Sequence, residues 1–171
     1  MRINSYRTVA CIGVIGLLTG IAGTAQAPVQ MRLSGLINDY SAAGGPWHIH
    51  ADWVLQVRGE SARADFTAAV AMVHSDLWVL LTQADPANTE ARSPHTHHVT
   101  LTNGDVTALA NGFRVNGTAS ITGNGNPSFV SPVQIDITGG SDVRYSNISL
   151  TFGGAAATHF GTAPLNGVVV Y

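Results

Sequence analysis

The sequence predicts an all-β protein, an antiparallel barrel or sandwich of about eight strands. Apolar and polar residues alternate with a period of two through most of the chain, and no long helical pattern follows the first 27 residues. Asn-Gly pairs, which are typical of hairpin turns, begin at positions 103, 111, 116, 124 and 166. Together these patterns favour short strands joined by tight turns.

The N-terminal 27 residues resemble an export signal. Two arginines precede an uncharged and mainly apolar segment, 9–22, which is followed by small residues. That segment is too short for a comfortable membrane span, although an uncleaved anchor is the alternative. We expect a signal peptide over 1–27, cleaved after Ala25 or Ala27, and a single all-β domain over 28–171. The mature protein would then be secreted or periplasmic.

Composition narrows the classes of partner. The only cysteine, Cys11, lies in the signal, so the mature chain has no disulfide to stabilise it. All eight basic residues are arginines; two leave with the signal, so six remain against ten acidic residues, a net charge of about −4. This balance argues against a nucleic-acid partner, and no basic amphipathic helix is present to bind a membrane surface. The sequence does not define an oligomeric state.

The first half of the domain contains three predicted strands. Residues 31–40 form the first, and Pro46 opens the second, whose two faces are the most clearly distinguished in the chain. One face of this second strand is apolar and should be buried, because two exposed tryptophans would be costly: Trp47, Ile49, Ala51, Trp53, Leu55 and Val57. The third strand is 64–74, with Phe66, Ala68, Val70 and Met72 on one face.

The second half alternates strands with turns and loops. The run 77–81 predicts a short buried strand, and the polar segment 83–94 predicts a long surface loop or lid. Asn103-Gly104 and Asn111-Gly112 are predicted to be hairpin turns that join strands 97–102, 105–110 and 113–121. The remaining elements are a loop at 123–132 and strands at 133–138, at 143–152 with a bulge near Ser146–Asn147, and at 167–171.

The segment "RSPHTHHVTL", at 92–101, contains three histidines at the start of a strand. A two-residue turn at Asn103-Gly104 would pair His97 with Ala110 and place His97 on the apolar face of its strand. His98 would point outward. His95 shares the side of His97 if the chain stays extended between them.

Two histidines at i and i+2 of a strand can bind a divalent metal, and His159 in "THFG" or His74 would add a third ligand. The candidate metal ligands are therefore His95, His97, His159 and His74. Zinc, copper and iron all accept imidazole, and three protein ligands with an open position are typical of catalytic sites. The structural alternative is a buried histidine whose ring nitrogens bond backbone carbonyls, or a partly exposed loop cluster.

A second group, His48, His50 and Asp52, lies along one face of a single strand. His48 and Asp52 would be roughly 13 Å apart along it, so the three cannot hold one small ion without a bend. A polar outer face is the simpler interpretation. His74 with Asp76 would suit proton transfer, although a strand-end ion pair is the commoner role.

The segments "RSPHTHHVTL", "GFRVNGTASITGNG" and "THFGTAPLNGVV" resemble an uncharacterised group of small secreted proteins of bacteria and filamentous fungi. The resemblance covers most of the mature chain. It implies export and a single β domain, and it carries no site assignment.

The leading hypothesis is an exported β-domain that binds a small ligand or a divalent metal through inward histidines. One alternative is a metal-free isomerase, cyclase or lyase that uses a histidine as acid and base; another is a non-catalytic surface module. An outer-membrane barrel, with the tryptophan face toward lipid and His48, His50 and Asp52 lining the lumen, is a further alternative. No catalytic residue is assigned, because the chain lacks the G-x-S-x-G pattern and no strand leads through a glycine-rich loop into a helix.

Overall fold

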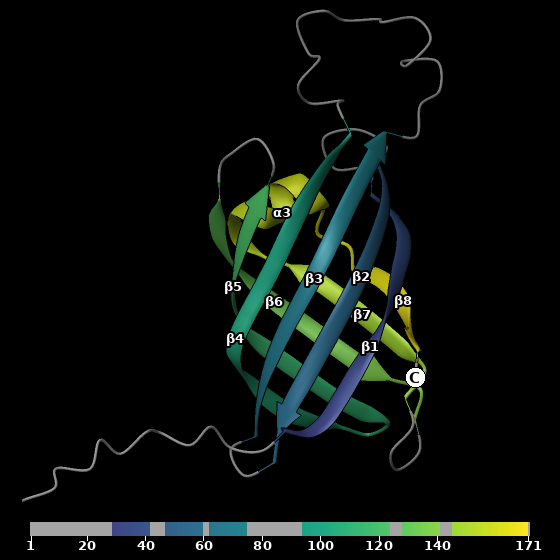
Figure 1. The fold of residues 1–171 in the computed structure, drawn as a ribbon, viewed down its shortest axis with the longest axis vertical. Coiled ribbons are helices and arrows are strands. Elements are labelled where there is room, and N and C mark those ends of the chain that lie inside the picture. The colour runs from purple at the N-terminus through teal and green to yellow at the C-terminus, as the bar shows by residue number, and fades with distance from the viewer. Residues whose placement is uncertain are drawn as a thin grey trace, which may run out of the picture.

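The protein is a closed antiparallel barrel with a short helix at one end (Figure 1). The structure, a computed structural model, describes residues 29–41, 47–59, 62–74, 94–123, 128–140 and 145–170. Its elements are β1 (Val29–Ser41), β2 (Trp47–Arg58), β3 (Arg63–His74), β4 (His95–Leu109), β5 (Gly112–Gly123), β6 (Phe129–Thr138), β7 (Asn147–Phe152), α3 (Gly154–Phe160) and β8 (Leu165–Val170).

Each strand pairs with the next along the chain, and β8 returns to pair with β1. At this closing seam Ser34 lies opposite Val170 and Ile37 opposite Gly167. The all-β prediction is confirmed, and the closed seam decides between the barrel and the sandwich.

The barrel interior is filled by the inward-facing side chains of the strands. The apolar face predicted for β2 is fully buried, while His48, His50 and Asp52 on its other face are exposed. Trp53 stacks on Phe66 near the middle of the barrel, with ring centroids 6.3 Å apart. An eight-stranded barrel has an interior just wide enough for such side chains. The tryptophan face, which the outer-membrane alternative placed toward lipid, therefore points into the barrel.

The predicted turn at Asn103-Gly104 is wrong, because β4 runs straight through it. Asn103 has a positive φ of 61°, and the register shifts between Leu101 and Asp105, so the pair forms a bulge. The backbone N–H of Asn103 donates to Asp65 on β3 at 2.8 Å, which replaces a ladder bond. Gly104 leaves room for the Leu101 side chain, since a Cβ there would lie 2.9 Å from it. An Asn-Gly pair serves here as a bulge within a strand.

The bulge changes the partners of His97. Val70 on β3 and Gly123 on β5 flank it, and the predicted partner Ala110 lies in the turn that begins β5. Its inward orientation is nevertheless as predicted, since the residue is buried. The direction of a strand side chain depends on alternation, whereas its neighbours depend on the register.

Two strand boundaries in the second half also differ from the prediction. β6 begins at Phe129, inside the segment expected to be a loop, and β7 begins only at Asn147, so no bulge at 146–147 is needed. The helix α3 was not predicted. It is the only helix in the part of the chain that the structure describes, and it is neither long nor apolar enough to cross a membrane. The predicted signal, the predicted strand 77–81 and residues 83–93 lie outside the described residues.

The helix α3 connects β7 to β8 and lies over one end of the barrel (Figure 1). At the same end β1, β3, β5 and β7 finish, and β2, β4, β6 and β8 begin. The first residues of β4 are therefore next to α3, although more than fifty residues separate them in sequence.

Candidate metal centre

Two histidines of the site lie in the first three residues of β4. His95 lies opposite Met72 and is half-buried, and His97 lies opposite Val70 and is buried. On the other side of β4, His97 faces Gly123, where a Cβ would lie 3.1 Å from Nδ1 of the imidazole. The absence of a side chain at Gly123 thus leaves space for the His97 ring inside the barrel.

The third histidine, His159, comes from α3 and is also half-buried. The first turn of this helix is attached to β6. The backbone N–H of Gly153 donates to the carbonyl of Pro132 at 2.8 Å, and that of Ala156 donates to the buried Ser131 hydroxyl at 3.0 Å. Ser131 therefore satisfies one of the N–H groups that the start of a helix leaves without an intrahelical partner.

The last turn of α3 is held by the end of β1. Ser41, the final residue of β1, donates its hydroxyl to the carbonyl of Phe160 at 2.7 Å. Phe160 itself is buried and stacks on Phe152, with ring centroids 4.3 Å apart. Contacts at both ends thus fix the position of His159, which precedes Phe160.

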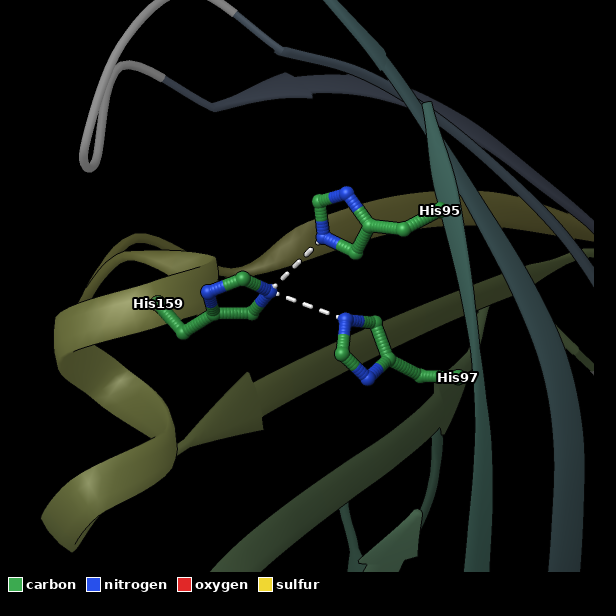
Figure 2. A group of neighbouring side chains, drawn as sticks. All are labelled: His95, His97 and His159. Atoms are coloured by element: carbon green, nitrogen blue, oxygen red, sulfur yellow. Dashed lines mark hydrogen bonds between the residues drawn. The ribbon is translucent and has the colours of Figure 1, made fainter. Parts of the chain in front are cut away.

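The three imidazoles converge through their Nε2 atoms (Figure 2). Nε2 of His159 is 2.9 Å from Nε2 of His97 and 3.1 Å from Nε2 of His95. A neutral imidazole nitrogen carries either one proton or one lone pair, so Nε2 of His159 cannot form two linear hydrogen bonds at once. One ion at the centre would accept a lone pair from all three rings. The sequence-predicted residues His95, His97 and His159 are thus brought together.

These distances fit first-row metal coordination. Two nitrogens about 2.0–2.1 Å from a tetrahedral zinc ion lie roughly 3.3 Å apart. The observed separations of 2.9 and 3.1 Å are a few tenths of an ångström shorter, and one ligand atom from each histidine lies within 4.8 Å of the others. Binding one ion therefore requires the His159 nitrogen to move slightly away from the nitrogens of His95 and His97.

Burial and neighbouring imidazoles favour the neutral forms of His97 and His159. The pKa of His97 is lowered from 6.5 to about 4, mainly by burial and then by the neighbouring His159 and His95, while the Thr122 backbone acts weakly in the opposite direction. The pKa of His159 is lowered by burial and by His95. Neutral imidazole is the form that binds a metal ion, so the lowered pKa values favour the ligand state at neutral pH.

The structural alternative does not account for both ring nitrogens of His97. The Thr122 backbone hydrogen-bonds the ring and raises its pKa against the larger effect of burial, although the buried Nδ1 has no partner of normal geometry. Nε2 faces Nε2 of His159 at 2.9 Å. A histidine kept only for packing would be expected to have both ring nitrogens satisfied by the backbone.

The described surroundings of the cluster are aromatic. Trp47 packs edge-on against His95, with centroids 5.1 Å apart. Phe129 lies 6.5 Å from the ring of His97 and 6.4 Å from that of His159, and Phe160 contacts both at 5.1 and 4.9 Å. Such apolar rings lower the local dielectric around any bound ion.

The other histidines lie elsewhere. His74 is buried at the end of β3 and packs edge-on against Trp47 at 5.1 Å, but it is not a member of the converging group. The prediction that His74 is a metal ligand therefore has no geometric support. His98 points outward, and His48 stacks on His50 at 6.4 Å on the exposed face of β2.

No protein-family model, curated protein or solved structure matches the chain. The site therefore has to be interpreted from its own geometry. Sequence patterns missed α3 and its anchor Ser131, and the only local signal was the run Gly153-Gly154-Ala155-Ala156-Ala157, where two flexible residues precede three strong helix formers.

Proposed function

We propose that this protein is an exported metal-binding barrel in which His95, His97 and His159 hold one divalent metal ion. The observation that carries this proposal is the convergence of three Nε2 atoms from two separate elements, with separations of 2.9 and 3.1 Å. Export rests on the N-terminal sequence alone.

Zn²⁺ fits the three histidines best among the metals that accept imidazole. Zinc commonly takes three protein ligands and keeps a fourth position open, and it imposes no geometry beyond the tetrahedron that these distances approach. Copper and iron also bind imidazole and are the competing ions. When bound, such an ion would act as a Lewis acid, and the chain supplies its position and a largely apolar surround.

The metal-free enzyme alternative has less support. It requires a closed apolar pocket beside an acid–base histidine, but the described barrel interior is occupied by packed side chains such as Trp53, Phe66 and Leu101. The lowered pKa of His97 also keeps that ring uncharged, so it would be a poor proton donor at neutral pH.

The proposal is tested by measuring the metal content of the protein purified natively without chelators. We expect about one equivalent of zinc, copper or iron per chain, and loss of that ion in His97→Ala. His98→Ala is the matched control, since it removes the next histidine along β4, which points outward. Circular dichroism checks that both variants keep the barrel.

Two results would contradict the proposal. One is a folded protein that neither retains a metal nor binds added Zn²⁺, Cu²⁺ or Fe²⁺ in calorimetric titration. The other is equal binding by His97→Ala and His98→Ala, which would assign the ion to the exposed His48 and His50. A His48→Ala/His50→Ala double variant should keep the tight site and lose only weak surface binding.

A further inference from the structure

The histidine cluster contributes no negative charge. Three neutral imidazoles leave the double charge of a bound ion uncompensated by the residues that the structure describes, since the converging group contains no carboxylate. Of the five described aspartates, Asp65, Asp105 and Asp136 form ion pairs with arginines on neighbouring strands, and Asp52 points outward from β2.

The fifth described aspartate, Asp39, lies nearest the helical end but is already engaged. Its carboxylate accepts hydrogen bonds from the backbone N–H of Tyr40 at 2.8 Å and from the backbone and side chain of Asn166 at 2.6 and 3.1 Å. These bonds join β1 to the start of β8. Asp39 is therefore a structural link between the two strands that close the barrel.

The uncompensated charge would be costly in aromatic surroundings. Trp47, Phe129 and Phe160 border the imidazoles, and a charge in such surroundings is stable only when it is paired. Three protein ligands leave a fourth position on a tetrahedral ion, and an anion there would supply the missing charge.

We propose that the fourth position takes a small monocarboxylate with an aromatic or apolar body. This proposal rests on the proposed metal site. The carboxylate oxygen is a ligand that zinc accepts readily, and Phe129, the half-buried ring among the three that border the cluster, provides surface against which an apolar body packs.

The positions of the described basic residues favour a monoanion over a phosphate-like dianion. Binding a multiply charged anion in proteins typically requires arginine or lysine donors in addition to a metal. The chain has no lysine, and the described arginines lie toward the opposite end of the barrel: Arg32, Arg58, Arg63 and Arg114. Three of them are also paired with aspartates.

The test uses the purified protein loaded with Co²⁺, which replaces zinc and whose visible absorption reports changes in its ligands. Benzoate is the probe, acetate is the same anion without the aromatic body, and benzyl alcohol is the aromatic body without the charge. We expect saturable, one-to-one spectral change with benzoate, at least tenfold weaker binding of acetate, and no change with benzyl alcohol.

A pair of variants tests whether the aromatic body of the ligand packs against Phe129. Phe129→Leu should reduce the preference for benzoate over acetate several-fold, whereas Val130→Ala, which alters the outward-facing neighbour, should not. Equal affinities for benzoate and acetate, or equal effects of the two variants, would overturn the role of the aromatic border.

A cobalt spectrum that no carboxylate changes would overturn the proposal while leaving the metal site intact. Failure to bind Co²⁺ or Zn²⁺ at all would overturn the metal site itself, and this proposal with it.

Discussion

At the scale of single residues, His97 shows which properties of a site a sequence can predict. Strand alternation placed its side chain inside the barrel, and the structure agrees, although the hairpin used to derive its partners does not exist. The error came from Asn103-Gly104, which has the composition of a turn. Whether such a pair turns or bulges depends in part on Asp65, which is 38 residues away in sequence and accepts the hydrogen bond of the Asn103 N–H.

The buried His97 ring predicts how the metal-free protein responds to acid. Its folded pKa is about 4 against 6.5 for an ordinary histidine, so between these values the unfolded chain binds a proton that the folded chain does not. Stability should therefore fall as the pH falls from about 7 toward 4, and His97 should add no further loss below that. We expect about 1–2 kcal/mol between pH 7 and pH 5 from this residue, after allowance for solvent screening.

Denaturant unfolding in the presence of a chelator measures this pH dependence. His97→Leu should flatten it, because the substituted side chain cannot take up a proton in either state. His98→Leu serves as the control and should keep the wild-type slope, since that histidine is exposed. Identical slopes in the two variants would show that the acid sensitivity comes from other groups.

At the scale of elements, α3 adds a third histidine to the two that β4 supplies. β4 alone supplies His95 and His97, which the sequence identified as companions, and His159 was proposed only as a possible third ligand. The distance between β4 and α3 could not be predicted, because it follows from barrel closure and from the anchors Ser131 and Ser41. Long-range contacts of this kind leave no periodic pattern in the sequence.

The anchoring of α3 can be weakened at Ser131. Ser131→Ala leaves the backbone N–H of Ala156 buried without its acceptor, which should cost about 1–3 kcal/mol or let the first turn unwind. Either outcome displaces His159, so we expect zinc affinity to fall at least several-fold in calorimetry. Thr158→Ala is the matched control, because its exposed hydroxyl bonds only to Ala155 within the same helix. Equal zinc affinities in these two variants would contradict an anchoring role for Ser131.

At the scale of the whole molecule, closure of the barrel was the feature that the sequence left open. Alternation identified which faces are buried, and those faces suit a sandwich and a barrel equally. The difference lies in the contact between the first and last strands, where residues Ser34 to Ile37 of β1 pair with β8 and Asp39 accepts hydrogen bonds from Asn166. Two glycines on this seam, Gly35 and Gly167, permit the close approach, since a Cβ on either would lie 1.9 or 2.1 Å from a carbonyl oxygen of the opposite strand.

The seam predicts that Gly35→Ala destabilises the whole barrel. The added methyl group would overlap the carbonyl of Val168 and press on the indole of Trp53, which is 2.8 Å away, so β8 must move outward. We expect a loss of about 2–4 kcal/mol in the free energy of unfolding, in the range of overpacked cores. Gly153→Ala is the control, because its nearest neighbour is Pro132 at an ordinary 3.4 Å.

Because β8 follows directly from α3, the same variant also tests whether the seam and the site are coupled. Zinc binds only the folded state and should raise the melting temperature of every variant that keeps the site. If displacement of β8 reaches α3, Gly35→Ala should gain less from saturating zinc than Gly153→Ala does, and its zinc affinity should be lower. If both variants gain equally, the β1–β8 seam stabilises the fold without controlling the site, and the contacts of α3 with β1 and β6 alone position His159.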